Sequence, residues 1–346
     1  MQPTLVVERI NSEKWDELVP RFRDTSYRQC SSYASAAASH VGARSELTQL
    51  IDDQRLIGLA DVRVKQLPMV PLGVAYSSYA PIVLQDEHSY ERQFGRCLDA
   101  LREEYVERRR LVLRITPALA GGLFQDIQTS CLKSRGFYRN SEQSARETFV
   151  LDLERPLEDI RSGFDPKWRS DLTRAEKAAI KIVRSVDVAD FNHFERIFLD
   201  LTKKKGFMPN QDVSFFRHIQ SKTPKEQKFI LHLAWHDGEL VAGHLGSYVG
   251  STSVYLLGAS SAKGRELRAS YLLQWSAIAY SKEVGNSFYD LGGIDQQNNP
   301  DVYRFKRRLN GRHVTEVGPY ELAPGVVSKH AVRLAELARN VLRRGT

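Results

Sequence analysis

The segment from residue 287 to residue 322 carries the side chains best suited to chemistry in this sequence. An apolar run leads straight into Gly292 and Gly293, and a helix-like segment with Tyr303 and Lys306 follows. Consecutive glycines let a backbone approach another group closely, and residues three apart share a helix face. The ammonium of Lys306 is therefore suited to binding an anion or to stabilising the oxyanion of an acyl transfer.

Two carboxylates, Asp290 and Asp295, flank these glycines. Acyl transfer to an amine needs a group that removes the amine proton, and either aspartate could act as that general base. Aspartate beside glycine is also typical of turns, so a structural role is the alternative for both.

Several common catalytic signatures are absent from the sequence. It has no GxxxxGK[ST] loop, GxGxxG fingerprint, GxSxG elbow or HExxH pair, which disfavours phosphate-loop NTPases, dinucleotide enzymes, α/β-hydrolases and common zinc proteases. His232, His236 and His244 lie at even spacing in strand-like segments, without Asp, Glu or Cys at ligand spacing. We therefore expect structural histidines, no metal site and no resident cofactor.

Length and composition favour two globular domains and an anionic partner. The chain has 346 residues, and 50 Lys and Arg against 42 Asp and Glu give a net charge of +8. Domains average roughly 150 residues, so two are expected. Three dispersed cysteines and the lack of a window near the ~20 apolar residues of a spanning helix predict a protein of the reducing cytoplasm.

Elements of the two halves follow one another in the same order. The patterns predict strands at 55–68, 111–116, 147–153, 253–259 and 286–291, helices at 90–110 and 266–284, and a hairpin over 229–249 that turns at Asp237 and Gly238.

Two faint sequence matches between the halves predict an internal duplication. The run that begins at Leu56 pairs with the run at Leu240, and the segment at Lys133 pairs with that at Phe305. We expect an α+β architecture of two units with mixed sheets flanked by helices. The predicted domains are 1–153, with 320–346 as a candidate completion, and 154–319.

A basic segment opens the second half. An apolar stripe at helical spacing predicts one helix from Lys167 to Arg184, and the stripe is formed by Trp168, Leu172, Ala175, Ala179 and Ile182. The opposite arc then gathers five cations, Lys167, Arg174, Lys177, Lys181 and Arg184. This arc is interpreted either as a landing surface for RNA or other phosphates or as an ordinary solvated face.

Several motifs in combination resemble the FemABX family of peptidoglycan interpeptide-bridge aminoacyltransferases and its related acyltransferase branch. They are the WRSDLTRAEKAAI run at Trp168, GELVAGHL at Gly238, YLLGAS at Tyr255, YDLGGID at Tyr289, VYRFKRRLNG at Val302 and GPYEL at Gly318. In the first half, Trp15, residues 31–33, the LIGLADV run and YAPIV at Tyr79 fall in the family's order.

The resemblance implies two tandem acetyltransferase-like (GNAT-like) domains and transfer of an aminoacyl group from a charged tRNA to an amine of a peptidoglycan precursor. It implies that Lys306 stabilises the tetrahedral oxyanion, and that Tyr255 and the strand end from Tyr289 to Gly293 line the acyl channel. The remaining candidates for substrate binding are Tyr303, Arg304, Arg265 and Arg268.

Two enzymatic functions remain open from the sequence. The first is transfer from aminoacyl-tRNA to a peptidoglycan precursor or a peptide natural product. The second is transfer from acyl-CoA or an acyl carrier to an amino sugar or cell-surface polysaccharide precursor. Segments 33–40 and 207–216 lack the cations of family members that use nucleotide-linked muropeptide, which favours the second; segment 258–270 lacks a [QR]xxGx[GA] loop, which disfavours CoA. A non-catalytic protein that binds an anion is a third interpretation.

The C-terminal segment 326–344 has apolar residues near one face with arginines around it. Packing on the protein body and a peripheral contact at the inner face of the membrane are both consistent with that pattern.

Overall fold

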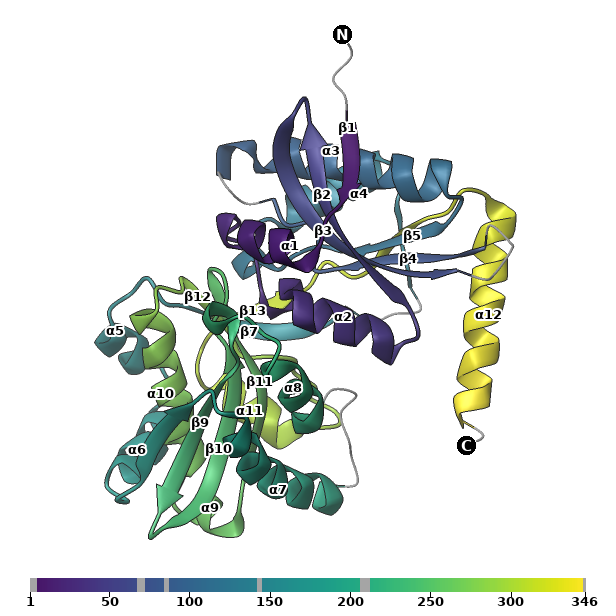
Figure 1. Ribbon diagram of the computed structural model, residues 1–346. Helices are drawn as coiled ribbons and strands as arrows, with labels where there is room; N and C mark the ends of the chain where they lie inside the picture. Colours follow the sequence, from purple (N-terminus) through teal and green to yellow (C-terminus); the bar gives the residue numbers. More distant parts are fainter. Residues whose placement is uncertain (1–4, 67–71, 84–86, 142–144, 206–211, 345–346) are drawn as a thin grey trace. The chain divides into compact units, whose positions relative to one another are not determined.

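The computed structural model describes residues 5–66, 72–83, 87–141, 145–205 and 212–344 (Figure 1). The chain divides into two compact units. Unit 1 comprises Met1–Ala145 and Glu316–Thr346, and unit 2 is the continuous segment Arg146–Thr315.

Unit 1 is built on a seven-stranded sheet of order β1-β2-β3-β4-β5-β14-β6. Only the β4–β5 pair is parallel, and the other pairs are antiparallel. The strands are β1 (Leu5–Arg9), β2 (Arg44–Asp52), β3 (Arg55–Gln66), β4 (Gly73–Ser78), β5 (Val112–Thr116), β6 (Tyr138–Arg139) and β14 (Tyr320–Leu322).

Helices pack apolar side chains onto this sheet. They are α1 (Ser12–Leu18), α2 (Ser31–His40), α3 (Tyr90–Leu101), continued by a π-helix (Arg102–Arg108), α4 (Gln125–Ser134) and α12 (Val326–Arg344). Phe94 and Leu98 of α3 are fully buried in the core of unit 1, with Leu113 and Ile115 of β5. Burial of these side chains is the main contribution to the stability of the unit.

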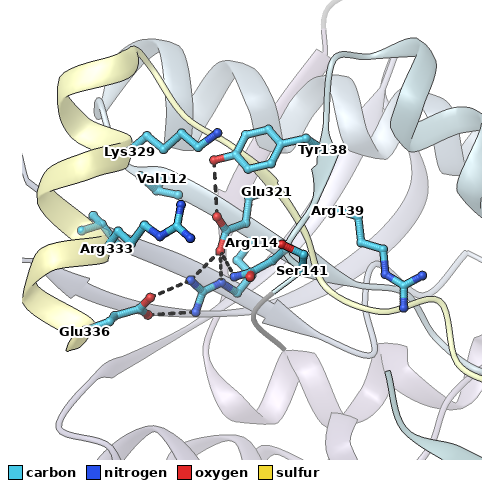
Figure 2. Close-up of a pocket in the computed structure, with 11 residues that line it drawn as sticks. Val112, Arg114, Tyr138, Arg139, Ser141, Glu321, Lys329, Arg333 and Glu336 are labelled. Carbon is cyan, nitrogen blue, oxygen red and sulfur yellow. Dashed lines mark hydrogen bonds and ion pairs between the residues drawn. The ribbon is translucent and has the colours of Figure 1, made fainter. Parts of the chain in front are cut away.

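A network of charged side chains joins α12 to β5 (Figure 2). The buried Arg114 donates from Nη1 and Nη2 to the two carboxylate oxygens of Glu336, at 3.0 and 3.1 Å, and from Nε to Glu321 at 2.6 Å. A bidentate guanidinium–carboxylate pair of this kind fixes the helix in one orientation.

None of the helices in the described part of the chain combines the length and apolar character needed to cross a bilayer.

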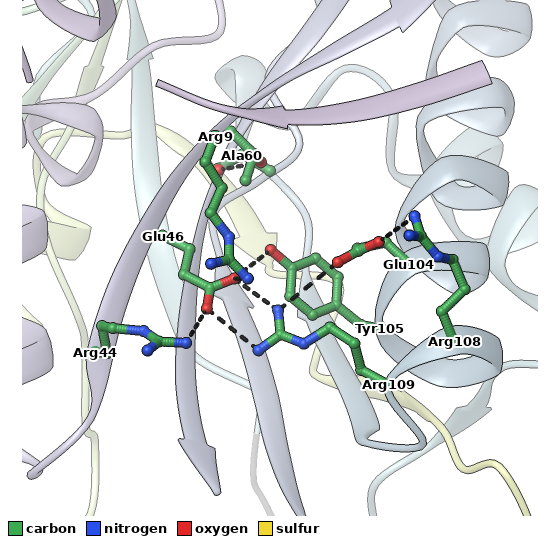
Figure 3. Close-up of polar contacts among 9 residues, drawn as sticks. Arg9, Arg44, Glu46, Ala60, Glu104, Tyr105, Arg108 and Arg109 are labelled. Atoms are coloured by element: carbon green, nitrogen blue, oxygen red, sulfur yellow. Dashed lines mark hydrogen bonds and ion pairs between the residues drawn. The ribbon is translucent and has the colours of Figure 1, made fainter. Parts of the chain in front are cut away.

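A second polar cluster in unit 1 surrounds Glu46 (Figure 3). Its carboxylate accepts from Arg109 at 2.7 and 3.2 Å, from Arg44 at 2.7 Å and from the hydroxyl of Tyr105 at 3.0 Å. Burial alone would raise the pKa of Glu46, but these arginines hold it below its ordinary value. Because the carboxylate is fully engaged, the cluster ties β2 to the π-helix.

Unit 2 has a second seven-stranded sheet, of order β8-β9-β10-β11-β12-β7-β13. Here the β11–β12 pair is parallel and the other pairs are antiparallel. The strands are β7 (Glu147–Asp152), β8 (Lys181–Ser185), β9 (Ile230–His236), β10 (Glu239–Ser247), β11 (Thr252–Ser260), β12 (Phe288–Asp290) and β13 (Arg312–Thr315).

The helices of unit 2 are α5 (Leu157–Ser162), α6 (Pro166–Glu176), α7 (Val188–Lys205), α8 (Val213–Gln220), α9 (Ala262–Glu266), α10 (Ala269–Glu283) and α11 (Pro300–Arg307). Trp168 and Leu172 of α6 are fully buried beside Ala277 and Ile278 of α10. The predicted hairpin is confirmed, since β9 and β10 turn at Asp237 and Gly238, both at positive φ.

The two sheets have the same strand order and a parallel pair at the same place, which confirms the predicted duplication of a GNAT-like unit. Both sequence matches fall on equivalent elements. The runs at Leu56 and Leu240 form the third strands, β3 and β10, and the segments at Lys133 and Phe305 precede the seventh strands, β6 and β13.

The predicted boundary at 153 is corrected to 145, because strand 147–152 pairs with β12 and β13 of unit 2. The corresponding sixth strand of unit 1 is β14, which pairs with β5 and β6 and lies in the segment considered as a completion. Each sheet thus receives its sixth strand from a different point of the chain, which local patterns do not reveal.

The predicted single helix over 167–184 is wrong beyond Glu176. Asp165 caps α6 by accepting from Lys167 N at 2.9 Å, and Pro166 occupies its first turn. Ala179 then takes a φ of 49°, which is incompatible with a helix and turns the chain into β8. Ala179 is exposed and Ile182 is half-buried on a strand, so the apolar stripe ends at Ala175.

Candidate active site

The parallel strands of unit 2, β11 and β12, lie inside the sheet and stop pairing toward their C-terminal ends. The β11–β12 register runs from Thr252 and Phe288 to Val254 and Asp290 and ends there. The register between β10 and β11 also shifts at this point, because Gly246 pairs with Tyr255 and Leu245 with Leu257. A bulge of this kind bends a strand away from its neighbour.

Gly292 is required by the geometry just beyond this end. Its φ is +76°, and a Cβ at this position would lie 2.6 Å from the main-chain oxygen of Tyr255. A side chain is excluded on both counts. The expectation that the glycine pair permits a close approach of backbone is correct, and the group approached is Tyr255 of the neighbouring strand.

Lys306 projects from α11 to the same strand end. Its side chain is 5 % exposed, and Nζ donates a hydrogen bond of 2.8 Å to the main-chain oxygen of Gly293. The ring centroid of Tyr255 lies 4.9 Å from Nζ, within range of a cation–π contact. A lysine ammonium has three donors, and Gly293 is its one hydrogen-bond acceptor among the described residues. Two of its N–H groups therefore remain available to a further acceptor.

The environment of Lys306 lowers its pKa to about 7. Burial is the main cause, and the positive charge of Arg146 adds to it, while the negative charge of Asp290 acts in the opposite direction. The residue therefore changes charge in the physiological range, where both the ammonium and the free amine are populated.

Asp290 holds the strand end together. Its carboxylate accepts from the hydroxyl of Thr148, from the backbone N–H of Gly292 at 2.8 Å and from Arg146 at 3.2 Å. The same Thr148 hydroxyl lies 2.9 Å from the main-chain oxygen of Gly292. Sequence reasoning missed Arg146 and Thr148, because they precede the motif by more than 140 residues and carry no local signal.

Tyr289 lies in the interior of unit 2. Its hydroxyl accepts from Gln274 Nε2 at 2.9 Å and lies 3.2 Å from Nε2 of His244. Burial, together with the nearby His232 and Lys306, keeps the pKa of His244 well below its ordinary value, so the ring is neutral. In the tautomer with the proton on Nδ1, Nε2 accepts a hydrogen bond from the Tyr289 hydroxyl. Burial raises the pKa of Tyr255 to about 12, so that hydroxyl also stays protonated.

The other candidates near the motif make their contacts with residues other than Lys306 in the described part of the chain. Asp295 is exposed and accepts from the backbone N–H groups of Gln297 at 3.0 Å and Asn298 at 2.9 Å, which identifies it as a turn residue. Arg304 is exposed and pairs with Asp301 at 3.5 Å. The ring of Tyr303, half-buried, packs against Phe149 with ring centroids 5.8 Å apart.

Arg265 and Arg268 precede α10. Arg265 is exposed and donates to the main-chain oxygen of Ser260 at 2.9 Å, and Arg268 pairs with Asp171 at 3.2 Å. A Cβ on Gly264 would lie 2.1 Å from the main-chain oxygen of Val241. Packing therefore explains this glycine without a ligand.

The five predicted phosphate-binding cations are all exposed but do not share a helix face. Lys167 and Arg174 lie on α6, Lys177 caps its end, and Lys181 and Arg184 lie on the edge strand β8. Arg184 is paired with Glu283 at 2.9 Å.

The segments that lack the family's cations are only partly described. Tyr33 is buried in α2, whereas residues 206–211 lie outside the described residues. The part of the chain that the structure describes contains no group of three His, Cys, Asp or Glu side chains placed to hold a metal ion.

Comparison with known proteins relates this chain to one family. The FemAB family model matches residues 220–336, which include the glycine pair and Lys306. Lipid II:glycine glycyltransferase of Staphylococcus aureus (strain MRSA252) is 20 % identical over 322 residues, covering 72 % of this chain and 75 % of the relative. The matched region supports membership of this chain in the FemAB family. The chain is a transferase of the acyltransferase class.

Solved structures support the FemAB fold across both units. The crystal structure of FemX covers 92 % of this chain and 97 % of its own, with a TM-score of 0.76 and 18 % identity. The C-terminal domain of a putative lysylphosphatidylglycerol synthetase from Agrobacterium fabrum covers 96 % and 95 %, with a TM-score of 0.56 and 13 % identity.

Proposed function

We propose that this FemAB protein transfers an aminoacyl group from aminoacyl-tRNA to an amine of a peptidoglycan precursor or a peptide natural product. The observation that carries the proposal is the buried Lys306 ammonium at the end of the β11–β12 pairing, with two N–H groups left for a substrate. An ester on tRNA is already activated, so the protein has to position it beside a neutral amine and to stabilise the oxyanion.

The proposed reaction runs through one tetrahedral intermediate. The amine nitrogen attacks the ester carbonyl, the new C–N bond forms, and the carbonyl oxygen becomes an oxyanion that accepts from Nζ of Lys306. The C–O bond to the tRNA ribose then breaks, and the leaving oxygen takes up the proton that the amine loses. No covalent enzyme intermediate is required.

In this proposal Asp290 is a positioning residue, since its carboxylate is occupied by Thr148, Gly292 and Arg146. It holds the turn that presents the Gly293 oxygen to Lys306, and its charge keeps more of Lys306 protonated. Asp295 is too well solvated to be an effective base, because its exposed carboxylate serves a turn and its pKa is lowered by Asn298.

The acceptor is proposed to be lipid-linked. The name of the Staphylococcus aureus relative states that it acts on lipid II. A lipid-linked acceptor would require this protein to work at the inner face of the membrane, attached peripherally. The net charge of +8 is suited both to tRNA and to an anionic lipid surface.

The alternative donor is acyl-CoA or an acyl carrier, with an amino sugar or polysaccharide precursor as the acceptor. The structure gives this alternative little support at α9, where Gly264 is explained by packing against Val241.

A donor-exchange experiment tests the proposal. The full chain is incubated with a mixed pool of charged tRNAs and, in parallel, with acyl-CoAs, each with lipid II and a nucleotide-linked muropeptide as acceptors. Mass spectrometry should show a product heavier by one amino acid residue in the tRNA reactions. Product formed only with acyl-CoA would overturn the assignment of the donor, and a Lys306→Met reaction controls for uncatalysed transfer.

A further inference from the structure

A separate pocket of about 140 Å³ lies within unit 1, between α12 and one end of the sheet (Figure 2). Side chains of β5, β6, β14 and α12 line it. It shares no residue with the strand end around Lys306. The proposed acyl transfer therefore leaves this pocket without a role.

The acidic groups of the pocket are bound within its wall. The carboxylate of Glu336 accepts hydrogen bonds from both terminal nitrogens of the buried Arg114. The carboxylate of Glu321 accepts from Nε of Arg114 at 2.6 Å and from Asn140 at 2.6 Å. Desolvation acts against the charge of Arg114, but these carboxylates raise its pKa above the ordinary value. Arg114 and the two carboxylates thus form a fixed, charge-paired wall of the pocket.

Cations outnumber carboxylates around the cavity. Arg139, Lys329 and Arg333 join Arg114 in the lining, against Glu321 and Glu336, which leaves a net charge of +2. Lys329 reaches the cavity above the ring of Tyr138, with Nζ 3.9 Å from the ring centroid. Burial and Glu321 raise the pKa of Tyr138 to about 12, so its hydroxyl stays neutral beside these charges.

The size and charge of the cavity define the class of its ligand. A volume of about 140 Å³ is below the roughly 300 Å³ at which sites for drug-sized ligands begin, so one compact group fits. A phosphate monoester carries roughly −1.5 to −2 charges and three acceptor oxygens, which matches cations from different elements and the net charge. We propose that this pocket binds a phosphate group.

The two sides of α12 indicate where that phosphate could come from. Its inner side carries Lys329 and Glu336 against the sheet, whereas Val326, Val327, Leu334 and Leu337 are 71, 80, 66 and 50 % exposed. A helix that turns its apolar side outward is suited to a lipid surface. A lipid headgroup and a free phosphate present the same chemistry to the pocket, and the experiment separates them.

Binding of inorganic phosphate to the full chain is measured by titration calorimetry at constant ionic strength, with acetate in a parallel titration. The test variant is Lys329→Gln with Arg139→Gln, and the control is Lys133→Gln with Arg92→Gln, which removes two exposed cations of unit 1 away from the pocket. The test variant should weaken phosphate binding about ten-fold or more, as loss of two charge-assisted contacts implies.

Flotation with vesicles separates the two sources. Phosphatidylcholine vesicles with phosphatidic acid should retain the parent and the control variant more strongly than the test variant if the phosphate is a lipid headgroup. Phosphate binding without vesicle retention assigns the pocket to a free phosphate. The proposal is overturned if phosphate binding and vesicle retention are equal in the two variants, or if acetate binds as tightly as phosphate. The activity of the Lys306 site is not part of either measurement.

Discussion

The ammonium of Lys306 lies 2.8 Å from the main-chain oxygen of Gly293, under the open end of the β11–β12 pair. This contact engages one of its three N–H donors. In the proposed reaction the other two donate to the carbonyl oxygen as it becomes an oxyanion, and the burial of Lys306 and the glycine pair position its charged nitrogen beside the ester.

Removal of the ammonium should therefore abolish most of the activity. Lys306→Met keeps the length of the side chain, and loss of an oxyanion donor lowers turnover by about 10²- to 10³-fold. Arg307→Gln, at an exposed position of α11, is the matched control and should retain the parent rate. A Lys306→Met enzyme that turns over within a few-fold of the parent would remove the basis of the proposed function.

The pH dependence should move in opposite directions in two variants. The rate should decline above the pKa of Lys306, about 7, as the ammonium loses its proton. Asp290→Asn removes a charge that raises this pKa, so the alkaline limb of kcat/KM should move to lower pH. Arg146→Gln removes a charge that lowers it, so the limb should move to higher pH. Equal or absent shifts would argue against Lys306 as the group that titrates.

The same burial should reduce stability in a pH-dependent manner. The folded pKa of Lys306 is about 7 against 10.5 in an ordinary environment, so the unfolded state binds more protons between these values. The free energy of unfolding should then rise with pH across this window, and the penalty is fully present below it. Lys306→Met should be more stable than the parent at about pH 6, by a few kcal/mol at most. Urea unfolding of both proteins at several pH values measures this difference, and parallel curves would contradict it.

The close approach of the strands at Gly292 can be tested against a glycine with similar backbone but open space. Gly292→Ala should shift the strand end and reduce activity by about ten-fold or more, since the new Cβ meets the Tyr255 oxygen at 2.6 Å. Gly285 also has a positive φ, +86°, but a Cβ at this position would meet no atom within 4 Å. Gly285→Ala is therefore the control. It should lose only the roughly 1–2 kcal/mol of stability expected for alanine in this conformation. Equal activity in the two variants would show that the contact has no part in catalysis.

The exposed cations at the end of α6 and the start of β8 bear on the donor. Lys177→Glu with Lys181→Glu should weaken tRNA binding and reduce its salt dependence if phosphates contact this surface. Lys133→Glu with Arg92→Glu in unit 1 is the control with the same change of charge. Binding is measured by filter retention over a salt series. Equal tRNA binding in the two double variants would show that this surface is an ordinary solvated face with no role in tRNA binding.

The duplication was predictable because the same hydrophobic patterns recur in both halves, and the runs at Leu56 and Leu240 do form equivalent strands. The end of the helix that begins at Pro166 was not predictable, although the apolar spacing over 167–184 is regular as far as Ile182. A period of 3.6 residues identifies a face but does not show where the chain leaves the helix. Here α6 ends at Glu176, and the positive φ of Ala179 then turns the chain into β8.

The sequence by itself determined which residues could do chemistry, since a glycine pair followed by a lysine on a short helix is a local pattern. Only the tertiary structure decided how those residues are held. Arg146 and Thr148 reach Asp290 because β7 enters the second sheet beside β12, and the buried Lys306 takes its pKa from charges brought together by that pairing. Strand pairing over long separations and the loss of solvent around a charge are properties of the folded chain, so no local window of sequence contains them.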